Sequence, residues 1–276
     1  MRATTPLTSR RFICLGLGAT LCGCAGAATP ITRAGSDAIA RASAEIGNLP
    51  PPPRRQVPPG EITATLARIS ARLDAPAQAL CREIGRGACV WWVQGSRSRQ
   101  INAHAALDGR VVINRGIFEY ATKEEEVAFV VAHEIAHHAA NHVAQSRDNA
   151  EIGTALGAVL GGALVIAGAL GGARSTPTSN RRSIEGTART GGRLADLAFS
   201  KDQEREADHL GATLLVRAGY DVAAARSFLL TMARASARRE TGLFDSHPAG
   251  PERLAAFDRT LAELRGTVQA PAREIS

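Results

Sequence analysis

The sequence predicts an α+β protein that is mainly helical and carries a small antiparallel sheet. Two segments, one opening at Thr122 and the other at Ser200, have the spacing of apolar residues that is typical of buried helices. Before the first of these, short β-like runs are separated by turn signals. Helices that outnumber a few short strands in one chain favour the α+β class.

The elements can be placed in order along the chain. Residues 61–84 have a helical period that Pro76 interrupts. Strand-like runs follow at residues 89–93, 100–103 and 110–113, and Asp108-Gly109 before the last run is a hairpin turn signal. These runs predict the small antiparallel sheet.

The helix that follows the sheet should be central. It opens with a capping box, Thr122 to Glu125, and is apolar on nearly every side before His133. The segment 200–211 opens with a second capping box, formed by Ser200 and Gln203, and continues as an amphipathic helix.

Length and composition predict one domain and argue against nucleic-acid binding. A chain of 276 residues with 45% hydrophobic content can bury one core. The formal net charge is +7, but Lys123 and Lys201 are the only lysines and the arginines are scattered among Ala and Gly. We therefore expect no basic groove and no nucleic-acid partner.

The N-terminus has the layout of an export signal. Residues 1–23 combine a basic start, an apolar run and small residues, and Leu21-Cys22-Gly23-Cys24 resembles a lipobox. The mature protein would then begin at a lipidated Cys24 and be anchored to a membrane in the periplasm, the outer membrane being favoured over the inner. A plain cleaved signal is the alternative, and the partial twin-arginine match at residues 9–11 leaves the export route open.

The segment after the signal predicts a tether, and two cysteines remain in the domain. Residues 24–60 are polar and rich in proline, which is typical of a linker rather than a packed element. The catalytic domain should then span residues 61–270. In an oxidising compartment Cys81 and Cys89 either form a disulfide or stay as two buried thiols.

The sequence AHEIAHHAANHV, residues 132–143, predicts a metal site. At about 100° per residue, His133 and His137 lie on one helix face and one turn apart, so both rings can reach one ion. In the HExxH arrangement two imidazoles bind zinc, zinc lowers the pKa of its water toward about 7, and the glutamate, here Glu134, acts as general base. On the same helix His138 and His142 should point elsewhere.

A carboxylate on the second helix is the preferred third ligand. Glu204 lies at the inward-facing start of the apolar stripe of that helix, where an unpaired carboxylate would be costly. Asp208, one turn later, should orient a histidine from outside the ligand set. Glu206 lies about 200° from Glu204 and should face solvent.

These two helices resemble those of a known enzyme family. HEIAHH together with Glu204, Ala207 and Asp208 resembles the HtpX-like and CAAX-prenyl-protease-like zinc metallopeptidases, peptidase family forty-eight, and within it the periplasmic lipoprotein branch. Further runs match in order at residues 102–105, 109–118, 217–221 and 246–254. The resemblance implies a gluzincin-type fold in which His133, His137 and Glu204 bind one Zn²⁺ and Glu134 is the catalytic base. His104 departs from the aromatic residue that is commoner there in the family.

Two further residues keep two interpretations each. His247 either serves the reaction, by donating a hydrogen bond to the oxyanion or by binding zinc in a resting state, or it is a cap or packing residue. Asn102 either lies on an edge strand that pairs with an extended peptide or is an ordinary strand residue.

The insert between the two metal helices is uncharged and glycine-rich. Residues 152–173 are long enough for a membrane span, but His137 and Glu204 flank the insert and must meet on one ion, which argues against a single crossing. We expect a helix or helical hairpin that packs on the domain, contacts the membrane surface or an envelope protein partner, or covers the cleft as a lid, followed by a flexible polar loop at residues 174–192.

The expected function is zinc-dependent endopeptidase activity. The resemblance implies unfolded, misfolded or misassembled envelope proteins as substrates. The rival hypothesis is a non-catalytic, zinc-bearing assembly factor or chaperone for outer-membrane proteins, and a third is a lipoprotein without metal.

Overall fold

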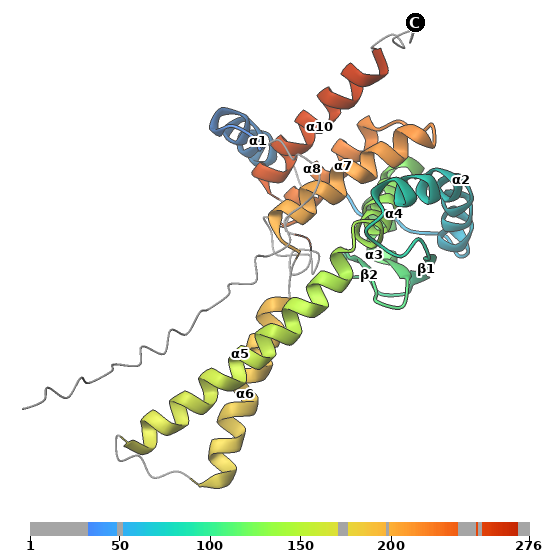
Figure 1. Ribbon diagram of the computed structural model, residues 1–276. Coiled ribbons are helices and arrows are strands. Elements are labelled where there is room, and N and C mark those ends of the chain that lie inside the picture. Colours follow the sequence, from blue (N-terminus) through green and yellow to red (C-terminus); the bar gives the residue numbers. More distant parts are fainter. Residues whose placement is uncertain are drawn as a thin grey trace, which may run out of the picture.

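The computed structural model describes residues 33–48, 52–170, 176–196, 199–236, 247 and 250–269. The expected signal peptide and Cys24 lie outside these residues. Helices dominate and a three-stranded sheet lies beside them, so the prediction of a mainly helical α+β fold is confirmed (Figure 1).

The sheet is mixed rather than antiparallel. Its strands are β1 (Trp92–Ser96), β2 (Ala103–Ala105) and β3 (Arg110–Asn114), in the order β1-β3-β2. The Asp108-Gly109 turn joins β2 and β3 into the expected antiparallel hairpin, in which Ala103 pairs with Ile113. Strand β1 lies parallel to β3, with Val93 paired to Val111, and β3 lies between β1 and β2. Both β1 and β2 are therefore edge strands.

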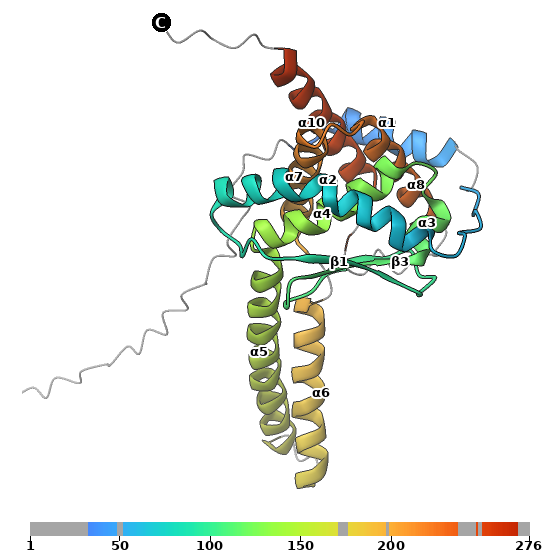
Figure 2. The same ribbon diagram turned by 90° about the vertical axis from the view of Figure 1, so that its right-hand side faces the viewer.

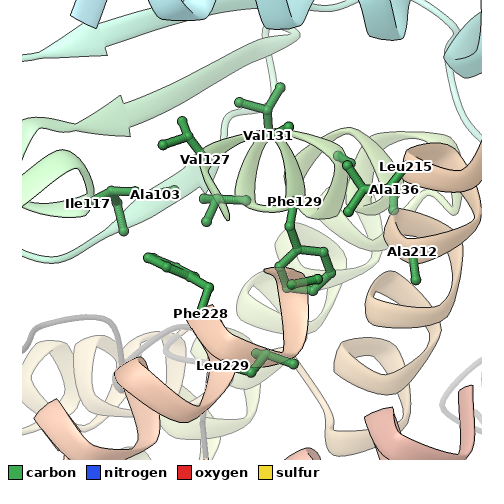
Figure 3. Packing of buried hydrophobic residues seen from close by; sticks show 14 of the residues in the cluster. Ala103, Ile117, Val127, Phe129, Val131, Ala136, Ala212, Leu215, Phe228 and Leu229 are labelled. Atoms are coloured by element: carbon green, nitrogen blue, oxygen red, sulfur yellow. The ribbon is translucent and has the colours of Figure 1, made fainter. Parts of the chain in front are cut away.

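Helix α4 (Glu124–Ala139) is the central element of the fold. Helix α2 (Glu61–Ile84) packs on α4 and on β1, while α4 also contacts β2 and β3. On its other side α4 packs against α7 (Lys201–Arg217) and α8 (Ala223–Ser236). Figure 3 shows Phe129 of α4 directed toward α8, and Ala136 facing α7. The short helix α3 (Arg115–Tyr120) continues from β3.

Helix α2 runs without a break through Pro76, where the sequence predicted an interruption. Leu73, Ala77 and Leu80 are buried on either side of the proline. Their packing offsets the backbone hydrogen bond that proline removes.

The range expected to be a tether contains a packed helix. Helix α1 (Ser36–Asn48) lies against α10 (Pro251–Gln269) and α8. Its Ala42 is buried, and the carboxylate of Glu45 accepts hydrogen bonds of 2.8 and 2.7 Å from Arg226. The proline-rich run that suggested a linker, Pro50 to Pro53, follows this helix.

The insert forms an arm of two antiparallel helices that projects from the body (Figures 1 and 2). Helix α5 (His142–Leu170) leads outward and α6 (Pro177–Asp196) returns, so the flexible loop expected at residues 174–192 is helical over its described part. Gly161 of α5 lets α6 approach closely, because a Cβ there would lie 2.9 Å from the Cα of Ile184. A helical hairpin was among the expected conformations.

The outer face of α5 is apolar and exposed. Residues 142–167 are long and apolar enough to cross a membrane by length and composition, and little of this stretch is buried. Large apolar side chains are exposed along it, namely Ile152, Leu156, Val159, Leu160, Leu164, Ile166 and Leu170.

Candidate metal centre

The two histidines of the HExxH sequence face one point. Helix α4 begins one residue later than the predicted Thr122–Glu125 capping box implies: Lys123 is the N-cap, and the carboxylate of Glu126 accepts hydrogen bonds from the backbone N–H groups of Thr122 and Lys123. The helix then carries His133 and His137 one turn apart, both buried, with 3.0 Å between their Nε2 atoms.

Helix α7 brings Glu204 to the same point. Its N-terminus has the predicted capping box, in which Ser200 Oγ accepts from Gln203 N and the Gln203 side chain accepts from Ser200 N. In its first turn, Glu204 Oε1 lies 3.4 Å from His137 Nε2 and Oε2 lies 3.5 Å from His133 Nε2. The structure thus brings together the three residues that the sequence predicted as ligands.

His247 joins this cluster from a segment that precedes α10. Its Nδ1 lies 2.9 Å from Glu204 Oε1 and 3.3 Å from His133 Nε2, and its Nε2 lies 3.4 Å from Glu134 Oε1. One ligand atom from each of His133, His137, Glu204 and His247 lies within 4.8 Å of the others, and all four side chains are buried.

The donor set fits a divalent cation such as zinc. Three imidazoles and a carboxylate are the ligand types that zinc prefers, and one atom of each converges on one point. Within the described part of the chain, His247 Nε2 and Glu134 Oε2 are buried without a hydrogen-bond partner. An ion at the centre would satisfy the converging lone pairs, and Glu134 lies beside it with one oxygen free.

Asp208 and Arg253 surround the His133 side of the cluster. Asp208 Oδ1 lies 3.0 Å from His133 Nδ1, so Asp208 occupies the orienting position predicted for it. Arg253 donates to both Asp208 oxygens at 2.7 Å, and its Nη1 lies 2.7 Å from Glu204 Oε2. Arg253 lies in the run at residues 246–254, but no role was predicted for it.

These charges shift the pKa values of the buried groups. Burial raises the pKa of Glu204 and Asp208, but the Arg253 guanidinium and the neighbouring histidines together outweigh it and hold both pKa values below their ordinary range. Burial lowers the pKa of His133, but hydrogen bonds to Asp208 and Glu204 raise it to about 9. Burial holds the pKa of His137 well below its ordinary value. In the metal-free protein the carboxylates are therefore ionised and ready to bind a cation.

His142 lies outside the cluster, as predicted, but it contacts the far side of the His137 ring, where its Nδ1 lies 3.1 Å from His137 Nδ1. The prediction assumed one continuous helix, whereas α4 ends at Ala139 and Asn141, with φ 63°, turns the chain before α5. Glu206 does not face solvent: it is fully buried, 3.1 Å from His142 Nε2 and paired with Arg86.

Two more side chains border the cluster. His138 points away from it as predicted, its Nε2 being 3.5 Å from the backbone oxygen of Arg110. Phe199 stacks on the His137 ring at 3.8 Å between centroids and 22° between planes. The sequence offered little indication of this stacking, because Phe199 is a lone aromatic residue just before the Ser200 cap.

The remaining predicted positions lie outside the cluster. Asn102 immediately precedes edge strand β2, accepts a hydrogen bond from Asn114 N through its backbone oxygen, and has a buried side-chain oxygen without a partner in the described structure. Cys81 and Cys89 are joined by a disulfide, the first of the two alternatives, with 5.7 Å between their Cα atoms.

An HExxH helix packed against a second helix that supplies a glutamate, within an α+β fold, defines a gluzincin-type metallopeptidase. The profile of peptidase family M48 matches residues 67–261. The chain therefore belongs to this family, whose members are zinc metallopeptidases.

Curated relatives match part of this chain. The beta-barrel assembly-enhancing protease of Escherichia coli (strain K12) is 35% identical over 175 residues, which cover 61% of this chain and 34% of the relative. The protein of that name from Yersinia pestis is 31% identical over 159 residues, which cover 56% of this chain and 31% of the relative. A protein from Vibrio cholerae with the name putative beta-barrel assembly-enhancing protease is 32% identical over 137 residues, which cover 50% of this chain and 27% of the relative. The chain spans about a third of the length of the first two.

Proposed function

We propose that this protein is a zinc-dependent endopeptidase of the bacterial envelope. The observation that carries the proposal is the convergence of His133, His137 and Glu204, from two helices, beside the carboxylate of Glu134. Zinc held there would polarise a peptide carbonyl and acidify water, which is the chemistry that a metallopeptidase requires. The relatives' names support a role in handling envelope proteins.

In this proposal each residue near the centre has a separate task. Glu134, with its free Oε2, takes a proton from the attacking water and passes it to the leaving amine. Arg253 holds Glu204 and Asp208, and Asp208 orients His133. The position of His247 among the ligand atoms favours the resting-state ligand over a packing role.

The surroundings of the centre suit an extended, apolar peptide. Edge strand β2, preceded by Asn102, contacts α4 and can pair with a peptide backbone. A small cavity of about 30 Å³ adjoins His133 and Glu134. Its lining is mostly apolar and consists of Ile117, Phe129, Val130, Phe228, Leu229, Met232 and His247, with Arg253. We expect substrates to be unfolded or misassembled proteins, in which apolar side chains are accessible.

The proposed location is the periplasm. Lipid on Cys24 would anchor the chain to the outer membrane, and the exposed apolar face of α5 would contact an envelope partner or the membrane surface. The relatives named as beta-barrel assembly-enhancing proteases support this location.

Loss of the proposed base tests the activity. The zinc-loaded full chain should degrade an unfolded protein at least about 100-fold faster than Glu134→Gln, because general-base catalysis contributes a factor of this order. Glu125→Gln is the matched control, since it makes the same change on the same helix in its first turn. If wild type and Glu134→Gln degrade the substrate at equal rates, the proposed activity is wrong.

A non-catalytic assembly factor is the second candidate, and the position of His247 favours it. A third histidine in the ligand set can occupy the position that water or substrate needs. The Glu134→Gln comparison separates the two functions, because a non-catalytic assembly factor would degrade the unfolded protein no faster with Glu134 than with Gln at that position.

A further inference from the structure

We propose that Arg86, Glu206 and His142 form a chain of positioning residues that fixes the tautomer of His137 and so presents its Nε2 to zinc. The inference rests on the proposed zinc site and adds three residues that act on it through His137.

The chain begins at a buried ion pair. The carboxylate of Glu206 is fully buried, and its Oε1 accepts a hydrogen bond from the Arg86 guanidinium. Its Oε2 lies 3.1 Å from His142 Nε2. A carboxylate that is paired with arginine only accepts hydrogen bonds, so His142 must carry its hydrogen on Nε2.

The next link determines the state of His137. With its hydrogen on Nε2, a neutral His142 has a bare Nδ1, and this atom faces His137 Nδ1 at 3.1 Å. His137 must then donate through Nδ1–H, which leaves its Nε2 lone pair free. That Nε2 is the atom that lies 3.0 Å from His133 Nε2 and 3.4 Å from Glu204 Oε1, at the centre of the cluster.

The two histidines of α4 thus reach the same tautomer by different routes. Asp208 accepts directly from His133 Nδ1, at 3.0 Å. At His137, the imidazole of His142 lies between the ring of His137 and the carboxylate of Glu206. Residues that orient metal-binding histidines in this way typically change metal affinity by 10–100-fold when they are replaced.

Local structure holds both ends of the chain. Arg86 lies in the loop closed by the Cys81–Cys89 disulfide. The loop is pressed against the end of α4 at Gly87, where a Cβ would lie only 1.9 Å from the backbone oxygen of His138. At the other end, the left-handed conformation of Asn141 directs His142 back toward α4.

Zinc affinity and histidine tautomers test the proposal. We would measure the zinc dissociation constant of the full chain by competition with a chelating indicator, for wild type, His142→Phe and the control His138→Phe. His142→Phe keeps an aromatic ring, somewhat larger than imidazole, and removes both nitrogens, so we expect 10–100-fold weaker binding. His138→Phe makes the same change at the neighbour of His137, outside the cluster, and should stay within about threefold of wild type.

A second readout separates positioning from general loss of structure. In zinc-free protein labelled with ¹⁵N-histidine, the ring of His137 should be in the Nδ1–H form, and Glu206→Gln, which keeps the volume of Glu206, should populate the Nε2–H form. If His142→Phe does not fold, as judged by circular dichroism, the tautomer and zinc affinity of Glu206→Gln decide the matter.

The outcomes have distinct meanings. The proposed positioning role is overturned if His142→Phe binds zinc within threefold of wild type, or if His142→Phe and His138→Phe lose equal affinity. An unchanged His137 tautomer in Glu206→Gln would also overturn it. If wild type itself binds no zinc, the proposed function fails first and the positioning role falls with it. If wild type binds zinc but does not degrade the substrate, the positioning role of Arg86, Glu206 and His142 is unaffected and only the catalytic proposal is contradicted.

Discussion

Gly211 lets the two helices of the metal centre approach closely. A Cβ at this position would lie 3.2 Å from the backbone nitrogen of His133, 3.3 Å from its Cα and 3.4 Å from the carbonyl carbon of Ala132. Carbon atoms pack best at about 3.5–4.0 Å, so α7 and α4 would have to separate by a few tenths of an ångström. Because the contact is with backbone, no flexible side chain can absorb the change.

The sign of the effect follows from two opposing terms. Overpacking of this kind costs about 1–3 kcal/mol, whereas replacing glycine by alanine in a helix stabilises by about 0.5–1 kcal/mol. We expect Gly211→Ala to lower the free energy of unfolding by about 1 kcal/mol. Gly211→Val should lower it by about 3 kcal/mol, because the branched side chain adds bulk and has a lower helix propensity.

Zinc binding should weaken in parallel. Glu204 lies seven residues before Gly211, close to the same face of α7, so a displaced helix carries Glu204 away from His133 and His137. Urea unfolding of the zinc-free protein, followed by circular dichroism, gives the free energy, and indicator competition gives the zinc dissociation constant.

Gly266 of α10 supplies the matched control. A Cβ there meets nothing within 4 Å, so Gly266→Ala should stabilise the protein by up to about 1 kcal/mol. The reasoning is refuted if Gly211→Ala stabilises the protein as Gly266→Ala does, or if Gly211→Val leaves zinc affinity unchanged.

Two further predictions concern charged groups. Arg253→Met should lower the free energy of unfolding by about 3–5 kcal/mol in urea, because it leaves the buried carboxylates of Glu204 and Asp208 without their cation. Arg217→Met, which breaks an exposed pair with Glu83, should cost far less than Arg253→Met, and equal losses would contradict this account. The hydrogen bond from Arg226 lowers the pKa of Glu45 below its ordinary 4.5, so this pair stabilises the fold above about pH 4.5 and loses its effect as pH falls through the lowered value. Arg226→Leu should therefore cost up to about 1 kcal/mol at pH 7 and less at pH 3, and a loss that is independent of pH would argue against this ion pair.

The convergence of His133, His137 and Glu204 was predictable because it depends on local periodicity. His133 and His137 are separated by one helical turn, and the Ser200–Gln203 cap fixes where α7 begins, so the face that carries Glu204 follows from counting residues. The Asp108-Gly109 turn likewise determined the β2–β3 pairing.

The errors arose where a segment depends on what covers it. Counting residues placed Glu206 opposite Glu204, but it could not show that Arg86 and His142 cover that face of α7. Residues 177–196 have the composition of a polar loop, yet they form α6 because α5 offers a partner surface with glycine at Gly161. The position of His142 depends on the left-handed turn at Asn141. Asparagine adopts that conformation more readily than most residues, but its presence in a sequence does not show that it does so.

The α5–α6 hairpin also bears on how the centre assembles during folding. His133 and His137 come together as soon as α4 forms, whereas Glu204 follows in the chain only after the whole arm. Closing a long flexible loop between them costs entropy that rises with loop length, but an antiparallel helix pair forms from local contacts and returns the chain to its starting point. The arm therefore shortens the effective loop, and a chain whose α6 has not yet packed along α5 holds only half of a metal site.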